Sequence, residues 1–227
     1  MSGYKQADCT LIDVSHSVEH GMITYKGLPA PIICDYLSRE ASKKNYQKGT
    51  SFQIGTVTMA SNTGTYVDVP FHRYEDGKDL SEFQLSRLAN LDGIKIDISS
   101  SVKSIEVEHL KNFDLRNKAV LLNTGWSKHW RTEHYFENHP FVSESAANYL
   151  LEQGVLFVGI DSHNIDDTNG DTRPCHSILL ANDIAICEHM TNLSELPVSG
   201  FKFFAVPVKM KGMGTFPVRA FGLIKSL

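Results

Sequence analysis

The chain has few of the features that mark secreted, membrane-spanning or disulfide-stabilised proteins. Its four cysteines are widely spaced and form no CxxC pair, which argues against a disulfide framework or a cysteine-based zinc site. No apolar run approaches the roughly 20 residues of a membrane-spanning helix. The first residues also lack the apolar segment of a secretory signal. These absences predict a soluble, cytoplasmic protein that makes no contact with membranes.

Charge runs, repeats and linker-like segments are missing as well. The 22 lysines and arginines and 26 aspartates and glutamates give a net charge of −4 and are scattered along the chain, so no nucleic-acid partner is expected. Nothing in the composition divides the 227 residues, a length that suits one well-buried core. We therefore expect a single domain over residues 1–227.

Hydrophobic patterning predicts an α/β fold dominated by strands. Alternating or continuous apolar runs predict strands over 10–15, 52–60, 94–98, 119–124, 155–160, 183–187, 201–208 and 218–224. Helical spacing predicts helices over 80–88, 105–113 and 143–153. The succession from 119 to 160 is typical of a parallel βαβ unit, while the later strands follow without a long helix. The fold class is therefore α/β with a mixed, β-rich sheet or barrel.

The most informative segment is 61–72, Ser-Asn-Thr-Gly-Thr-Tyr-Val-Asp-Val-Pro-Phe-His. Pro70 between Asp68 and His72 excludes a helix interior, so a turning backbone must carry both side chains. A turn at Gly64 would deliver them to a common pocket, where they could bind a metal or act as a carboxylate-oriented general base. The alternative is a turn-capping aspartate and a surface histidine.

His176 and Glu188 flank the apolar segment 178–186, which is expected to turn and return as a strand. Such a return could bring the imidazole and the carboxylate together, and these are ordinary ligands for zinc or manganese. The alternative is that they are two unrelated surface groups.

Further polar and aromatic residues could support such a site. Asp161 and Asp166 follow the strand at 155–160, and His16 follows the first strand. Each could hydrogen-bond and orient a metal-binding side chain, although turn and capping roles are common at such positions. The aromatic region 126–141 could form a wall or lid over a planar substrate, or an ordinary loop packed on the core or on a neighbouring subunit.

The order of these clusters resembles the cyclase-like metal-dependent hydrolase family, which includes bacterial kynurenine formamidase and isatin hydrolase. The resemblance covers almost the whole chain, from Asp-Val-Ser-His at 13–16 and Gly-Met at 21–22 to Pro-Val-Arg-Ala at 217–220. The family signature H-x-G-T-H-x-D-x-P-x-H falls on residues 62–72, with Asn62 and Tyr66 in place of its first two histidines. The resemblance implies a swivelling β/β/α fold and assembly as a homodimer or homotetramer, for which the aromatic region 126–141 would suit the interface.

The resemblance also implies roles for individual residues. Asp68, His176 and Glu188 would hold one divalent metal, zinc or manganese, and His72 would act in catalysis. Asn62 and Tyr66 are weak ligands and could instead hydrogen-bond the substrate or a developing oxyanion.

We therefore expect a kynurenine formamidase-like hydrolase that cleaves a C–N bond of a small amide, formamide or lactam, or a C–O bond. Two alternatives stay open. The chain could be a metal-poor family member that binds a small molecule without turnover. It could also be a metal-independent acid/base enzyme that opens a lactone, with His72 and Tyr66 as the proton-transfer pair.

Overall fold

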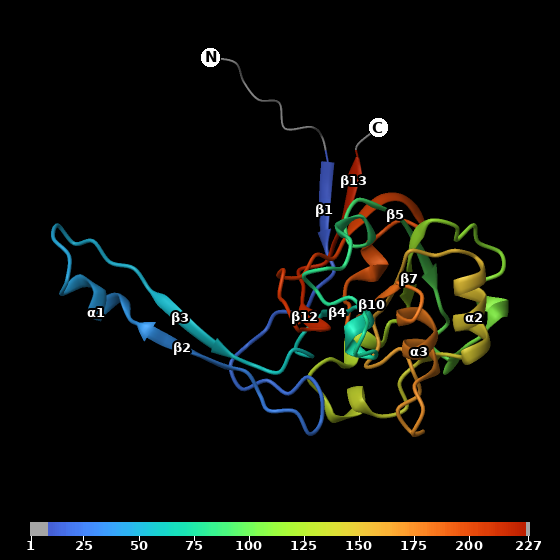
Figure 1. Ribbon diagram of the computed structural model, residues 1–227, viewed down its shortest axis with the longest axis horizontal. Helices are drawn as coiled ribbons and strands as arrows, with labels where there is room; N and C mark the ends of the chain where they lie inside the picture. Colours follow the sequence, from blue (N-terminus) through green and yellow to red (C-terminus); the bar gives the residue numbers. More distant parts are fainter. Residues whose placement is uncertain (1–8, 226–227) are drawn as a thin grey trace, which may run out of the picture.

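The protein is built on one curled, nine-stranded mixed sheet, seen in a computed structural model that describes residues 9–225 (Figure 1). The sheet order is β1-β13-β11-β5-β7-β9-β10-β4-β12. Its strands are β1 (Cys9–Asp13), β4 (Tyr66–Asp68), β5 (Leu91–Asp97), β7 (Lys118–Asn123), β9 (Phe157–Ile160), β10 (Ala185–Glu188), β11 (Ser199–Phe204), β12 (Thr215–Pro217) and β13 (Phe221–Lys225). The predicted α/β class with a mixed, β-rich sheet is confirmed.

The centre of the sheet is parallel. Strands β5, β7, β9 and β10 pair in parallel, and α2 (Glu144–Glu152) crosses from β7 to β9 as the predicted βαβ unit. Ser143 begins α2 by accepting a hydrogen bond from the Ala146 backbone N–H. The helix ends near Gly154, which has a φ of +69°.

Two hydrophobic clusters cover the two faces of the sheet. One packs α2 and α3 (Pro174–Leu180) on the alternate residues of the parallel strands, including Val120, Val158 and Ile186. The other contains Leu121, Phe157 and Cys187, whose side chains point to the opposite face. Strand β4 follows the same alternation, because Val67 joins the second cluster while Tyr66 and Asp68 face the side that carries α3.

A long arm leaves the body of the molecule between β1 and β4. It consists of β2 (Ile32–Leu37), α1 (Arg39–Lys43) and β3 (Ile54–Thr58), and among residues 9–225 the two strands pair only with each other (Figure 1). A small parallel pair, β6 (Ser104–Ile105) with β8 (Phe141–Val142), lies apart from the main sheet. None of the helices within residues 9–225 combines the length and apolar character that crossing a membrane requires.

Two predicted helices are wrong. Segment 80–88 contains only a 3₁₀ turn at Leu85–Arg87, and segment 105–113 only one at Val107–His109. Both segments lay apolar side chains on the core with helix-like spacing but without a helical backbone. In the first, the Asp79 carboxylate accepts hydrogen bonds from Ser81 and from the Glu82 backbone N–H, which stabilises a turn instead.

Candidate active site

Asp68 lies at the end of β4, fully buried between two neighbouring strands. Gly64 makes the preceding turn with a φ of +66°, and a Cβ at this position would come within 2.7 Å of the Val18 side chain. Strand β4 pairs with β10 and β12, and the latter register sets Thr215 opposite Asp68. The Thr215 hydroxyl donates to Asp68 Oδ1, whereas Asp68 Oδ2 is buried without a hydrogen-bond partner among the described residues.

His72 ends the 3₁₀ turn Pro70–His72 and reaches the same place from the cavity side. Its Nδ1 lies 3.6 Å from Asp68 Oδ1 and 2.8 Å from Thr215 Oγ1, and its side chain is 33% exposed. The one hydroxyl proton of Thr215 goes to Asp68, so Thr215 Oγ1 accepts from a protonated His72 Nδ1. A neutral His72 therefore carries its free lone pair on Nε2.

His176 on α3 and Glu188 on β10 converge on Asp68. His176 Nε2 lies 3.7 Å from Asp68 Oδ2 and 3.7 Å from Glu188 Oε1. The other ring nitrogen, Nδ1, lies 2.6 Å from Asp166 Oδ2, which orients the imidazole so that Nε2 faces the two carboxylates. The predicted return of the chain between His176 and Glu188 is thus present as the α3–β10 connection.

The charges of this group perturb one another. Burial alone would lower the pKa of His176, but Asp166, Asp68 and Glu188 together raise it to about 10. Burial raises the pKa of Glu188 to about 7 despite the opposing effect of His176. Buried groups that perturb each other this strongly are characteristic of functional sites.

Tyr66 is buried beside Glu188 and contacts it directly. Glu188 and Tyr66 are opposed in the β10–β4 register, and the Tyr66 hydroxyl donates to Glu188 Oε2 at 2.5 Å. The Ile165 backbone N–H donates to Glu188 Oε1 at 2.7 Å. Burial and the neighbouring carboxylates raise the pKa of Tyr66 well above its usual value, so it stays a neutral donor. Its hydroxyl is engaged by Glu188, and not left free for a substrate as the sequence suggested.

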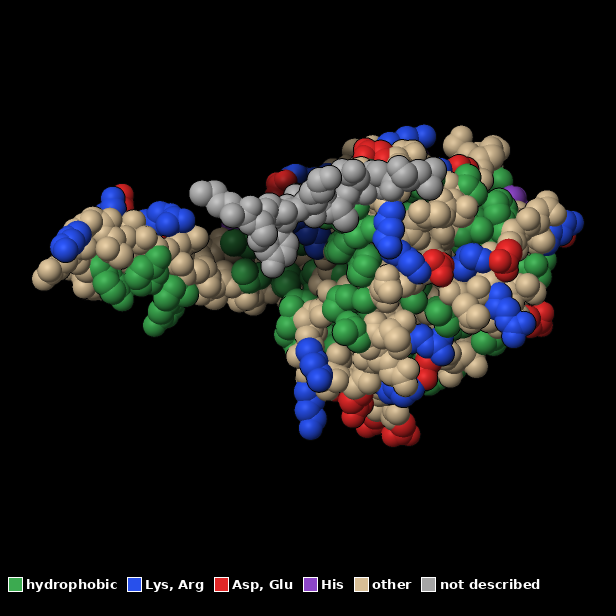
Figure 2. All heavy atoms as spheres, turned by 90° about the horizontal axis from the view of Figure 1, so that it is seen from above, with side chains coloured by type: hydrophobic (Ala, Val, Ile, Leu, Met, Phe, Trp, Pro, Cys, Tyr) green, Lys and Arg blue, Asp and Glu red, His purple; other side chains and the backbone are tan. Residues whose placement is uncertain are grey.

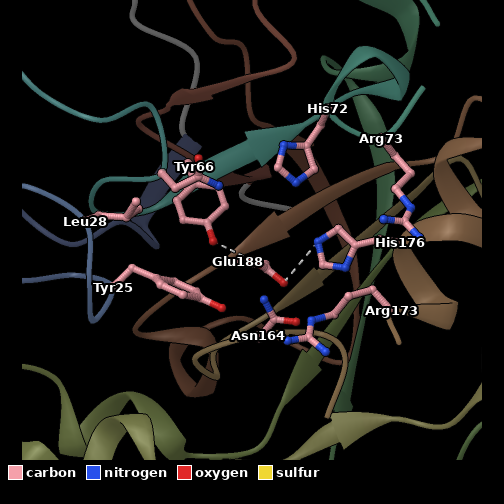
Figure 3. A pocket seen from close by; sticks show the side chains of 10 residues that line it. Tyr25, Leu28, Tyr66, His72, Arg73, Asn164, Arg173, His176 and Glu188 are labelled. Atoms are coloured by element: carbon pink, nitrogen blue, oxygen red, sulfur yellow. Dashed lines mark hydrogen bonds and ion pairs between the residues drawn. The ribbon is translucent and has the colours of Figure 1, made fainter. Parts of the chain in front are cut away.

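These side chains border a cavity of about 240 Å³ (Figure 3). Figure 3 shows His72, His176, Glu188 and Tyr66 around one side of it. The complete lining comprises Tyr25, Leu28, Asn62, Tyr66, His72, Arg73, Asn164, Arg173, His176 and Glu188. The cavity is therefore small, strongly polar on one wall and bordered by Tyr25 and Leu28 on another.

The donors present fit a divalent metal. Asp68 Oδ2 is a buried carboxylate oxygen without a partner, and His176 presents Nε2 while Asp166 occupies Nδ1. Ligand atoms of Asp68, His72 and His176 all lie within 4.8 Å of one another, so the structure offers His72 as well as Glu188 for a third position. Mixed nitrogen and oxygen donors of this kind suit first-row metals.

The other predicted residues lie at varying distances from this centre. Asp166 contacts His176 as expected, and Asn62 lines the cavity. The oxygens of Asp161 accept hydrogen bonds from Thr124 and from the Gly125 backbone N–H, so Asp161 holds the turn after β7. His16 stacks on Trp130 with ring centroids 4.0 Å apart, outside the cavity lining.

The aromatic region 126–141 contributes no residue to the cavity lining. Tyr135 is fully buried, and Trp126 Nε1 donates to the Tyr135 carbonyl. Within the chain the region is thus a packed loop, as one of the two interpretations expected. No motif in the sequence indicated Thr215, Arg73, Asn164 or Arg173. Three of them lie within three residues of a predicted site residue, which is the signal that could have found them, whereas Thr215 meets Asp68 only through strand pairing.

The chain matches a known protein family. Residues 12–167 match the model of the Cyclase family, described as "Putative cyclase". The chain belongs to the cyclase family. Cyclase-family relatives include the kynurenine formamidase of Bacillus cytotoxicus, 30% identical over 92% of this chain and 95% of its own length. The kynurenine formamidase of Bacillus cereus is 29% identical over the same shares.

Solved structures agree on the cyclase-like fold. Isatin hydrolase A from Labrenzia aggregata superposes with a TM-score of 0.82 at 19% identity, covering 96% of this chain and 94% of that one. A protein described as a potential metal-dependent hydrolase with cyclase activity superposes with a TM-score of 0.79 at 23% identity, covering 96% and 100%. The family resemblance and the fold inferred from the sequence are both confirmed.

Proposed function

We propose that this cyclase-family protein is a metal-dependent hydrolase that cleaves the C–N bond of a small amide, formamide or lactam. The observation that carries the proposal is the convergence of Asp68, His176 and Glu188 beside the cavity, with Asp68 Oδ2 left without a hydrogen-bond partner among the described residues. The kynurenine formamidases at 30% and 29% identity support a formamide as substrate. Cleavage of a C–O bond in an ester or lactone would use the same groups.

Asp68, His176 and Glu188 would hold one zinc or manganese ion. Such an ion acidifies a bound water and polarises a carbonyl oxygen. Asp166 holds His176 in the orientation that presents Nε2, and Tyr66 together with the Ile165 N–H holds Glu188. Tyr66 in this role is a positioning residue, because it acts through Glu188.

His72 is the proposed general base. Thr215 fixes the Nδ1–H tautomer, which leaves Nε2 on the cavity side as the proton acceptor. The same nitrogen can return the proton to the departing amine, because base and acid roles alternate along the reaction. Asn62 lines the cavity beside Tyr66, where its neutral side-chain amide would hydrogen-bond the substrate.

Metal counting together with an amidase assay tests the proposal. Elemental analysis of the purified protein should find about one metal per chain, lost in Asp68→Asn and His176→Ala but kept in Asp92→Asn, whose exposed carboxylate pairs with Lys202. Formate release from N-formyl-L-kynurenine and ring opening of isatin should both be assayed before and after chelation. The metal-dependent proposal would be contradicted if the protein bound no added metal, or if chelation left the rate of hydrolysis unchanged.

The same measurement separates the two possible third ligands. With Glu188 as ligand and His72 as base, His72→Ala keeps the metal and loses turnover. Loss of metal in His72→Ala with retention in Glu188→Gln would instead place His72 in the ligand set, as the clustering of Asp68, His72 and His176 allows.

We also propose that the protein is a homodimer or homotetramer. Strands β2 and β3 form a two-stranded ribbon that pairs with no other strand of the described chain, and such ribbons are marginal when isolated in water. Its exposed apolar side chains include Ile32, Tyr36 and Val57, which are 54%, 79% and 54% exposed (Figure 2). A second copy of the chain would cover this surface. The pairing of β1 with β13 supports a single domain, and four unpaired thiols support a cytoplasmic location.

A further inference from the structure

Two arginines lie on the wall of the cavity beside His176. Arg73 directly follows His72, and Arg173 immediately precedes α3, the helix that carries His176. Both line the same cavity as Glu188 and Asn164, and Figure 3 shows their guanidinium groups on the side where His176 and Asn164 lie. The wall next to the proposed catalytic groups is therefore positively charged.

Arg173 is held in place by the backbone. Its Nη1 donates to the carbonyl oxygens of Asp167, Gly170 and Thr172 at 3.2, 2.8 and 2.7 Å. Nη1 thus takes up the backbone contacts, and the Tyr25 hydroxyl also lies beside the Arg173 guanidinium. The five N–H donors of a guanidinium exceed these contacts, so some remain for a ligand. The side chain is only partly exposed, so little entropy is lost when it binds.

Arg73 is tethered to the same helix. Its Nε donates to Ser177 Oγ at 3.2 Å, one turn beyond the start of α3. Within residues 9–225, neither Arg73 nor Arg173 has a carboxylate oxygen within 4.0 Å, although Arg131 and Arg219 both do. Two guanidinium groups that share a cavity wall and lack an internal counterion form a site for an external anion.

The rest of the lining indicates what the anion belongs to. Asn164 Oδ1 accepts from the Asp166 backbone N–H, so its NH₂ group is the end left to donate into the cavity. Leu28 provides an apolar border, whereas the hydroxyl of Tyr25 lies near Arg173 and Glu188. Glu188 is buried in the cavity wall and repels a negative group placed next to it. A ligand that complements this whole lining has its anionic group at the arginines and a neutral carbonyl near His176.

We propose that Arg73 and Arg173 bind a carboxylate of the substrate, so that the enzyme selects small amides that carry a carboxylate over neutral amides and lactams. The inference rests on the proposed hydrolase function and specifies its substrate class. A guanidinium matches a carboxylate through paired N–H donors, and hydrogen bonds to charged groups are strong enough to alter affinity roughly 10- to 100-fold.

N-formyl-L-kynurenine and its methyl ester test this selectivity, because the ester replaces the carboxylate charge by one methyl group and leaves the formamide unchanged. Formate release should show a kcat/KM roughly 10- to 100-fold higher for the acid than for the ester, mainly through KM. In Arg73→Gln and Arg173→Gln the ratio of acid to ester should fall towards one. Arg116→Gln, an exposed arginine before β7 and away from the cavity, should keep the ratio of the unmodified enzyme.

The outcomes separate this inference from the proposed function. Release of formate from acid and ester with equal kcat/KM would overturn the role of the arginines and leave the hydrolase intact. Release of formate from neither compound would count against the amidase activity. Calorimetric titration of the purified protein with the same two ligands would then test whether the arginines bind the carboxylate. Tighter binding of the acid, abolished by Arg73→Gln, supports the site, and equal affinities overturn it. Because Arg73 is exposed, its variant does not depend on the folding of the loop that Arg173 anchors.

Discussion

Tyr66 acts on the candidate site indirectly, by holding Glu188 in position. The phenol is 1% exposed and donates to Glu188 Oε2, while the backbone of Ile165 satisfies the other carboxylate oxygen. Glu188 is therefore fixed by two donors before any ligand binds. Preorganised ligands of this kind raise metal affinity, because little reorganisation is needed on binding.

Tyr66→Phe should weaken both folding and metal binding. The ring volume is kept, but the buried Glu188 Oε2 loses the hydroxyl that donates to it. An unsatisfied buried acceptor of this kind lowers the free energy of unfolding by about 1–3 kcal/mol. Urea denaturation and the metal content after dialysis measure the two effects. Tyr149→Phe on α2 is the matched control and should change neither. Unchanged stability and metal content in Tyr66→Phe would show that Glu188 does not depend on the phenol.

Two histidines outside the cavity, the half-buried His16 and the buried His163, should make the protein sensitive to acid. Burial lowers the pKa of His16 to about 4 and that of His163 to about 3, against 6.5 for an unperturbed histidine. Between about pH 6.5 and 4 the unfolded chain binds protons that the folded chain excludes. The free energy of unfolding therefore falls as pH drops through this range, by roughly 1–2 kcal/mol per histidine at pH 5.

Urea denaturation between pH 7.5 and 5 checks this, with His16→Gln and His163→Gln as comparisons. Each variant loses one titrating group, so its stability should fall less steeply with acid than that of the unmodified protein. Identical slopes would mean that these imidazoles take up protons without unfolding.

Among the elements, the short strand β12 and the glycine before it decide where His72 lies. A Cβ added to Gly214 would come 2.1 Å from the His72 backbone nitrogen and 2.5 Å from its Cα. The Gly214 carbonyl also accepts from the Val69 N–H. Only glycine allows the two backbones to approach this closely.

Gly214→Ala should therefore displace His72. We expect a loss of roughly 1–3 kcal/mol in stability, as for other overpacked sites, and a lower kcat. Gly170→Ala is the control, because a Cβ there meets nothing within 4 Å. Thermal unfolding and turnover of both variants measure the effect, and an active, stable Gly214→Ala protein would contradict the assigned role of this contact.

The elements also show how far sequence patterns reach. Strands β7, β9 and β10 and helix α2 were predicted because long apolar runs and a capping serine mark them locally. Strands β4 and β12 were not, because three residues carry no periodicity, and these strands form through pairing of β4 with β10 and of β12 with β4. Asp68, His72, His176 and Glu188 were found through motif and resemblance. Thr215, which joins two of them, lies 147 residues from Asp68 and has no local signal.

At the scale of the molecule, the arm sets the β2–β3 ribbon away from the body (Figure 1), and several of its apolar side chains are exposed. Sedimentation velocity should find a dimer or tetramer, and Tyr36→Lys or Val57→Lys should shift it towards the monomer. Leu85→Lys, at a residue 61% exposed on the body, should leave the assembly unchanged. A monomeric unmodified protein would contradict the proposed assembly.

The position of β10 within the sheet has a consequence for the dynamics of the site. This strand is hydrogen-bonded on both sides, to β9 and to β4, and carries Glu188 at its end. Its amide protons should exchange with deuterium only through global unfolding, whereas those of the β2–β3 ribbon should exchange through local opening. The carboxylate would then stay in place during every partial opening of the protein.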